Sequence, residues 1–178
     1  MSATPTLPPP LGTPYRLGFV CLGNICRSPT ADVVMSRLVA DDGLEGRVEV
    51  SSCGTGGWHV GEPIDERAGA QLRAEGYDGS GHRGQQLDAS WLGHDLLLAM
   101  DAENLAGIRR LAVELGAGAD RALMFRAFDP EVPAGATGAA LDVPDPYYGG
   151  ADGFATVLAM VERTCRRLLD EVRLLLDR

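Results

Sequence analysis

Two spacings of apolar residues alternate along the chain, and they predict its secondary structure. Short runs of apolar and β-branched residues, typical of strands, occupy residues 15–20, 47–52, 94–100 and 122–125. Apolar residues at every third or fourth position, typical of amphipathic helices, occupy residues 29–40, 63–75, 104–115 and 153–176. Residues 81–92 follow neither spacing and predict a connecting loop with a short helix. Strands and helices are therefore expected to alternate.

This alternation predicts an α/β fold, with a single-domain parallel four-stranded sheet and helices on both faces. The 178 residues suffice for one domain, and no repeat or domain boundary is evident after residue 14. Residues 1–14 contain five prolines and predict a disordered or extended tail. Residues 15–178 are expected to form the domain.

In parallel sheets of this kind, ligands bind beyond the carboxyl ends of the strands. Three segments of interest follow predicted strands: the loop that begins at Cys21, the glycine-rich loop 53–61 that carries Trp58, and Asp101. We expect all three at one edge of the sheet.

The loop 21–29, CLGNICRSP, combines a nucleophile with an anion-binding site. A helix is predicted to begin at Pro29, with Ser28 as its N-cap. A loop that enters a helix directs several unpaired N–H groups to one point, where they bind an oxyanion and favour the thiolate of a cysteine such as Cys21. Arg27 adds a two-pronged donor suited to phosphate. From these residues alone, a helix start with two buried cysteines is the alternative.

Composition narrows the range of partners. All 16 basic residues are arginine, and without lysine the chain cannot form a Walker A nucleotide loop. The net charge of −9 argues against a nucleic-acid or anionic-membrane partner. The four cysteines form neither zinc-ligand spacings nor the framework of a secreted disulfide protein, so no metal or cofactor is predicted.

The sequence also carries an expectation about location. It shows no N-terminal secretory signal and no run of about 18 apolar residues that could span a membrane. A cytoplasmic location is therefore predicted.

The loop 21–29 closely resembles the signature loop of the low-molecular-weight protein tyrosine phosphatases of the bacterial type, which is a Cys, five residues, an Arg and then Ser or Thr. A second segment, Asp145-Pro146-Tyr147-Tyr148-Gly149, resembles the general-acid motif of the same family. Residues 54–61 are also similar to family members. The resemblance covers residues 15 to about 176, so it excludes only the tail.

The resemblance implies metal-independent hydrolysis of phosphotyrosine in two steps. Cys21 would attack phosphorus and form a phosphocysteine, which water then cleaves. Arg27 would hold the phosphoryl oxygens, and Ser28 would donate a hydrogen bond to the sulfur or the leaving group. Asp145 would protonate the leaving oxygen and later act as the base.

The same resemblance extends to the pocket and to partners. The pocket is expected to be formed by Leu22, Gly23, Asn24, Ile25, Cys26, Trp58, Tyr147 and Tyr148. Asn24 is expected to fix the loop, Asp101 to orient Arg27, and His82 to brace the loop from behind. An aromatic slot favours phosphotyrosine over the shorter phosphoserine. The expected partners are tyrosine-phosphorylated proteins and a cognate tyrosine kinase that phosphorylates Tyr147 and Tyr148.

Several alternatives remain open at this stage. Asp142 and Asp129 compete with Asp145 as the general acid, and Cys26 either forms a disulfide with Cys21 on oxidation or only packs beneath the loop. Arsenate reductases of the thioredoxin-coupled kind resemble this loop, but they need two further cysteines that residues 101–164 lack. A non-catalytic phosphoprotein-binding module on the same fold would be expected to lack Cys21 or Asp145.

Overall fold

The computed structural model describes residues 4–178, in which four parallel strands form one sheet in the order β2-β1-β3-β4. The strands are β1 (Tyr15–Cys21), β2 (Val48–Gly54), β3 (Leu96–Ala99) and β4 (Ala122–Met124). The α-helices of this part of the chain are α1 (Arg27–Asp41), α2 (Glu66–Ala74), α3 (Ala102–Glu114) and α4 (Ala151–Leu176). Short 3₁₀ helices cover Ala89–Gly93, Phe125–Phe128 and Gly138–Leu141. The predicted fold class is confirmed.

Strand β1 is central because it pairs with both β2 and β3. Its side chains alternate between the two faces of the sheet, as in any strand. Leu17 and Phe19 lie fully buried in the larger core, and Val20 lies in the core on the opposite face. A Cβ at Gly18 would lie 2.7 Å from Leu97 Cδ2, so the second face packs closely because residue 18 has no side chain.

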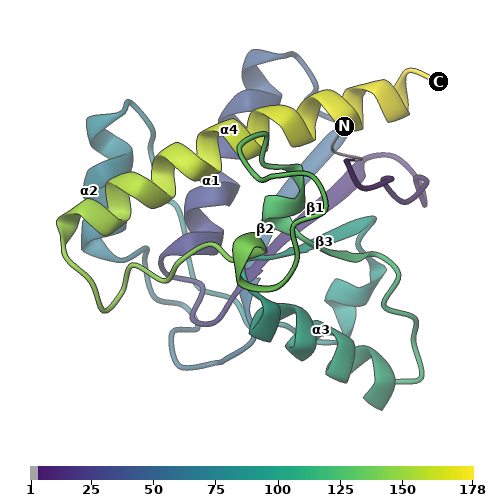
Figure 1. Cartoon of the computed structure of the whole chain (residues 1–178), viewed down its shortest axis with the longest axis horizontal. Coiled ribbons are helices and arrows are strands. Elements are labelled where there is room, and N and C mark those ends of the chain that lie inside the picture. The colour runs from purple at the N-terminus through teal and green to yellow at the C-terminus, as the bar shows by residue number, and fades with distance from the viewer. Residues whose placement is uncertain (1–3) are drawn as a thin grey trace.

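The helices lie on both faces of this sheet. Helix α4 runs across α1 on one face, and α3 lies on the other (Figure 1). The apolar stripe predicted for the last helix is buried in the larger core, through residues Val157, Leu158, Val161, Cys165, Leu168, Leu169 and Val172. None of the helices within residues 4–178 combines the length and the apolar character needed to cross a membrane.

The start of α1 differs from the prediction. The helix begins at Arg27 with Cys26 as its N-cap residue, and the side chain of Cys26 caps nothing. The prediction that Ser28 is the N-cap is therefore wrong. The reason is tertiary: Ser28 lies in the first turn, and its hydroxyl contacts Cys21 Sγ at 2.9 Å.

Residues 4–14 of the predicted disordered or extended tail form no helix or strand before β1 and pack against the domain, while residues 1–3 lie outside the described residues. Leu7 is buried in the larger core. The Tyr15 hydroxyl donates to the carbonyl of Pro8 at 3.0 Å, and the N–H of Leu11 donates to Asp95 Oδ1 at 2.6 Å. The segment thus packs along the body of the protein, because the Leu7 side chain and several backbone groups find partners that the local sequence does not reveal.

Candidate active site

The loop between β1 and α1 curls around the sulfur of Cys21. Asn24 adopts a φ of 54°, in the left-handed region that L-residues rarely occupy, and this turn brings its backbone N to 3.3 Å from Cys21 Sγ. The end of β2 approaches the loop so closely that a Cβ at Gly54 would lie 2.6 Å from the carbonyl oxygen of Leu22. The backbone, rather than side-chain bulk, therefore shapes the anion site.

The side chain of Asn24 holds the loop from behind. Its Nδ2 donates to Ser28 Oγ at 2.8 Å and to Ser52 Oγ at 3.0 Å, and its Oδ1 accepts from the N–H of Gln85 at 2.9 Å. The residue is fully buried, so it lies behind the pocket and is not among the residues that line it. His82 joins this support, because its Nε2 lies 2.7 Å from the carbonyl oxygen of Asn24.

The half-buried position of His82 sets its protonation state. Burial lowers its pKa from the usual value, although the bond to Asn24 and the charge of Asp32 act in the opposite direction. The imidazole is therefore neutral at pH 7, and Nε2 carries the proton that it donates to the loop carbonyl.

Arg27 is fixed beneath the pocket by three acceptors. Its side chain is buried; Nη1 donates to Asp101 Oδ2 at 2.6 Å and to the carbonyl of Val143 at 3.1 Å, and Nη2 donates to Asp145 Oδ2 at 3.3 Å. Burial acts to lower the pKa of Arg27, but the thiolate of Cys21 and the two carboxylates outweigh it and raise the pKa. The guanidinium is thus permanently charged and held in one orientation, largely by Asp101.

Of the three aspartates considered as the general acid, Asp145 alone lines the pocket. Its Oδ1 accepts from the N–H of Tyr147 at 3.1 Å, and its side chain is 34% exposed. Asp142 accepts from the backbone at the start of α3, and Asp129 is fully buried in an ion pair with Arg163. Position therefore favours Asp145 over both.

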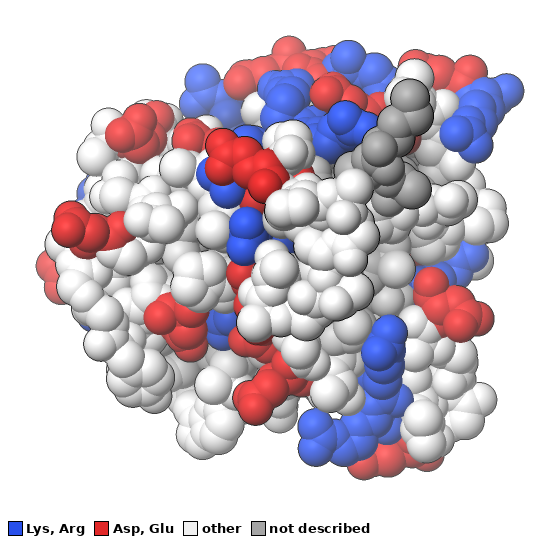
Figure 2. Space-filling view, viewed as in Figure 1, with Lys and Arg blue, Asp and Glu red and all other residues white. Residues whose placement is uncertain are grey.

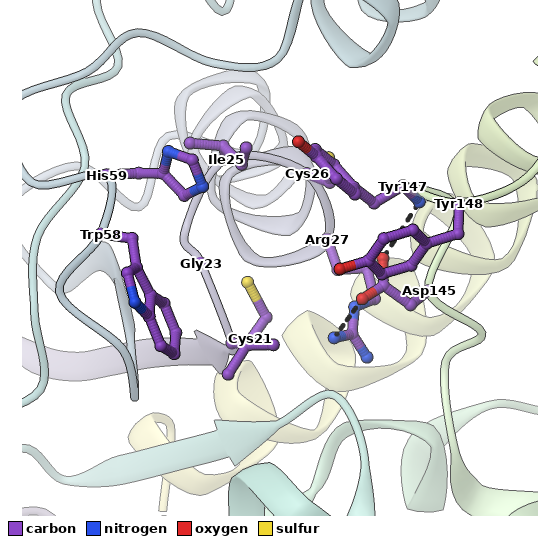
Figure 3. Close-up of a pocket in the computed structure, with 11 residues that line it drawn as sticks. Cys21, Gly23, Ile25, Cys26, Arg27, Trp58, His59, Asp145, Tyr147 and Tyr148 are labelled. Carbon is purple, nitrogen blue, oxygen red and sulfur yellow. Dashed lines mark hydrogen bonds and ion pairs between the residues drawn. The ribbon is translucent and has the colours of Figure 1, made fainter.

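The pocket is a cavity of about 260 Å³ with Cys21 at its floor. It is lined by Cys21, Leu22, Gly23, Ile25, Cys26, Arg27, Trp58, His59, Asp145, Tyr147 and Tyr148. Figure 3 shows Trp58 and His59 on one side and Asp145, Tyr147 and Tyr148 on the other, with the sulfur of Cys21 between them. The predicted pocket residues other than Asn24 thus come together.

Two side chains at the site are not among the site residues predicted from the sequence. His59 lines the pocket and bonds through Nδ1 to Glu62 Oε2 at 2.6 Å. Arg67 donates to the carbonyl of Tyr147 at 3.1 Å, and its guanidinium lies 5.3 Å from the centre of the Tyr147 ring. His59 could have been predicted at the pocket because it is next to Trp58 in the sequence. Arg67 could not, because it contacts Tyr147, which lies 80 residues further along the chain.

The wall formed by Trp58 depends on a glycine. A Cβ at Gly56 would lie 1.8 Å from Cζ3 of Trp58, so the indole ring packs directly on the backbone at residue 56. The ring itself is 71% exposed. A large apolar side chain left in solvent at the rim of a pocket is available for contact with a ligand.

The other three cysteines lie in apolar clusters. Cys26 packs in a small apolar cluster with Ala68 and Phe154, and burial, followed by the charge of Asp65, raises its pKa to about 12. Burial also raises the pKa of Cys53 and of Cys165, which lie in the two cores. Within residues 4–178, no three or more His, Cys, Asp or Glu side chains gather closely enough to hold a metal ion.

A cysteine and an arginine at the two ends of an anion-binding loop, with a carboxylate across the pocket, define a phosphatase that uses a cysteine nucleophile. Comparison with known proteins agrees: the sequence model of the low molecular weight phosphotyrosine protein phosphatases matches residues 16–175. The chain belongs to this family.

Individual relatives agree with this assignment. The chain is 48% identical over 160 residues to a low molecular weight protein-tyrosine-phosphatase of Streptomyces coelicolor, with 89% of this chain and 94% of the relative covered. The crystal structure of YfkJ from Bacillus subtilis is similar with a TM-score of 0.80 and 34% identity, covering 92% of this chain and 97% of that one. The predictions of the family and of the enzyme class are confirmed.

A structure of lower sequence identity is that of a phosphatase with a named substrate class and a modified nucleophile. The structure of the arginine phosphatase YwlE has a TM-score of 0.75 and 25% identity to this chain, covering 89% of this chain and 95% of that one. It was solved as a cysteine-to-serine mutant with a phosphorylated active-site serine.

Proposed function

We propose that this phosphatase hydrolyses phosphotyrosine in proteins through a phosphocysteine formed on Cys21. The observation that carries the proposal is the juxtaposition in one pocket of the Cys21 sulfur, the fixed Arg27 guanidinium and the Asp145 carboxyl group. The phosphorylated serine in the YwlE mutant supports a phosphoryl acceptor at this place in the fold.

In the first step, the Cys21 thiolate attacks phosphorus in line with the leaving oxygen. The N–H groups of the loop and the Arg27 guanidinium bind the equatorial phosphoryl oxygens, where charge is spread in the transition state. Asp145, in its acid form, gives a proton to the phenolate that departs. The sulfur–phosphorus bond forms as the oxygen–phosphorus bond breaks.

In the second step, water attacks the phosphocysteine and Asp145 accepts its proton. The thiolate of Cys21 is now the leaving group. Two donors stabilise it: the Ser28 hydroxyl at 2.9 Å and the N–H of Asn24 at 3.3 Å. Inorganic phosphate leaves and the thiolate is restored, so neither step requires a metal ion.

The walls of the pocket support an aromatic substrate. Trp58 and Tyr147 stand on opposite sides, and Leu22 and Ile25 add apolar surface. A phenyl ring fills such a slot and carries its phosphate to Cys21, whereas phosphoserine is too short to reach the floor while its peptide stays at the rim. The planar group of phosphoarginine has a similar reach, and the arginine phosphatase YwlE makes it the substrate to compare.

The partners of the enzyme are phosphoproteins. We propose in addition that it acts in the cytoplasm and that a cognate tyrosine kinase phosphorylates the rim tyrosines. Tyr148 is 87% exposed and Tyr147 is 40% exposed, which leaves both accessible to a kinase.

One assay tests the proposed function. Wild type and Cys21→Ser are compared in the presence of a chelator, with an aryl phosphate and with phosphotyrosine, phosphoserine and phosphoarginine as substrates. Wild type should hydrolyse the aryl phosphate and prefer phosphotyrosine, while Cys21→Ser should show no turnover but still bind phosphate, because the cradle is backbone and Arg27. Cys53→Ala, which removes a thiol from the opposite core, serves as the control. Near-wild-type turnover by Cys21→Ser would overturn the mechanism, and a preference for phosphoserine or phosphoarginine would overturn the substrate assignment.

A further inference from the structure

A second cleft adjoins the active-site pocket on the other side of Trp58. It has a volume of about 300 Å³ and is lined by Leu22, Thr55, Gly56, Trp58, Leu87, Gly107, Arg110, Leu111 and Glu114. Leu22 and Trp58 line both this cleft and the active-site pocket, so they form the ridge between the two. The two hollows are parts of one continuous surface.

Helix α3 forms one wall of the second cleft. Gly107, Arg110, Leu111 and Glu114 follow the spacing i, i+3, i+4, i+7, which places them on one face of the helix. The helix comes close to the loop after β2 because a Cβ at Gly107 would lie only 3.0 Å from Thr55 Cγ2. The wall is therefore held by close packing at its base.

Arg110 lines the second cleft and lies next to another arginine, and neither of the two has an internal partner among residues 4–178. Neither Arg110 nor its exposed neighbour Arg109 has a carboxylate within 4.0 Å, or a hydrogen-bond acceptor, among residues 4–178. Many other arginines are paired, as Arg166 and Arg173 are with Asp42. Two adjacent uncompensated arginines thus stand out in a chain whose net charge is −9.

The surroundings of Arg110 extend this positive site. Arg110 also lines a further groove on α3, together with Arg109, and Glu114 lines both hollows without pairing with Arg110. In Figure 2, basic side chains gather at the lower right, over the place that α3 occupies in Figure 1. Two cations and one carboxylate leave a net positive charge along the groove.

We propose that the second cleft binds the polypeptide that flanks the phosphotyrosine, and that Arg110 selects substrates with an aspartate or glutamate near the phosphorylated residue. The inference rests on the proposed function and adds a sequence preference to it. With the phenyl ring against Trp58, the peptide leaves the pocket at the ridge of Leu22 and Trp58, from which the second cleft is continuous. A guanidinium without a partner offers a carboxylate two parallel hydrogen bonds.

Matched phosphotyrosine peptides test this preference. Peptides with Glu, Ala or Lys at one to four positions on either side of the phosphotyrosine are compared by kcat/KM. Wild type should prefer Glu over Lys by about three- to tenfold on one side, since solvent-exposed ion pairs are individually weak. Arg110→Glu should reverse the preference, and Glu114→Gln should enlarge it. The preference should also shrink at about 1 M salt, where the screening length is about 3 Å.

Two controls separate the outcomes. Arg73→Glu changes an exposed arginine of α2, which also has no partner among residues 4–178, and should leave the peptide preference unchanged. All variants should hydrolyse a small aryl phosphate at the wild-type rate, because that substrate does not reach Arg110. If phosphotyrosine peptides are not hydrolysed at all, the proposed function fails. If they are hydrolysed with the same preference by wild type and Arg110→Glu, only the role of Arg110 is overturned.

Discussion

Asp145 divides its two carboxylate oxygens between a backbone N–H and the guanidinium of Arg27. The contact with Arg27 is long, at 3.3 Å, and a third of the side chain is exposed, so the carboxyl group is free to turn toward a leaving oxygen. Asp145→Asn should therefore slow hydrolysis of aryl phosphates with poor leaving groups by about 10²- to 10⁴-fold, and that of esters with good leaving groups far less. A series of substituted phenyl phosphates measures this dependence.

The control for this experiment is Asp142→Asn, since Asp142 lies outside the pocket and accepts a hydrogen bond at the start of α3. It should keep the wild-type dependence on the leaving group. An equal loss across the series in Asp145→Asn would place the general acid elsewhere.

Asn24 combines a left-handed backbone with side-chain bonds to Ser28, Ser52 and Gln85. Asn24→Ala and Asn24→Gly both remove these bonds, but alanine keeps a Cβ in the left-handed region, at a cost of about 1 kcal/mol relative to glycine. Urea unfolding should thus rank stability as wild type, then Asn24→Gly, then Asn24→Ala. Equal stability of the two variants would mean that backbone strain at residue 24 is negligible.

At the scale of elements, the loop between β2 and α2 supplies one wall of the pocket, and Gly56 sets its position. Because a Cβ at residue 56 would overlap the Trp58 ring, Gly56→Ala should displace this wall without removing it. We expect Gly56→Ala and Trp58→Ala both to raise KM for phosphotyrosine peptides and to narrow the margin over phosphoserine. Steady-state kinetics with the two peptides measures both effects.

Gly12→Ala is the matched control, because a Cβ there meets nothing within 4 Å. It should leave both KM values unchanged. A Gly56→Ala enzyme with wild-type KM for phosphotyrosine peptides would show that the exact position of the ring does not govern recognition.

The helices and strands could be predicted from the sequence because the apolar residues in each recur at the spacing of a helix or form the short run of a strand. The long stripe of α4 and the apolar run of β3 are visible without the structure. Their ends depend on partners distant in sequence. Ser28 has the local features of an N-cap, yet its hydroxyl is used by Cys21 within the first turn of α1.

The site could be predicted as far as its motifs extend. Cys21, Arg27 and Asp145 belong to short segments with recognisable chemistry, and the structure brings them into one pocket. Arg67 contacts the rim through a tertiary approach of α2 to the loop before α4, and Leu7 enters the core from a proline-rich segment. Neither contact has a local pattern from which it could be inferred.

At the scale of the whole molecule, the half-buried His82 and the buried His94 link stability to pH. The pKa of His82 and that of His94 are both lowered, in each case chiefly by burial. In the unfolded chain these groups take up protons near pH 6.5, whereas in the folded protein they do so only at lower pH. The stability that depends on these two histidines being neutral is therefore complete above about pH 6.5. It is lost as the pH falls through their lowered pKa values in the folded protein.

We accordingly expect the free energy of unfolding to fall between about pH 7 and pH 5. Asp32 contributes in the opposite sense, because burial raises its pKa and its contribution is lost as the pH rises. Urea unfolding at a series of pH values measures the slope, which should become flatter in His82→Gln combined with His94→Gln. A double variant with the wild-type slope would assign the pH dependence to other groups.

The ion pair between Arg27 and Asp145 joins residues 118 positions apart, and this separation has a consequence for the newly made protein. The phosphate-binding loop leaves the ribosome before the segment with Asp145 and the helix α4 that follows it. Domains fold as units, with the N-terminal part available first. A nascent chain that has not yet reached residue 145 therefore lacks the proposed general acid, so we expect full catalytic power only after that segment has been made and has folded against the loop.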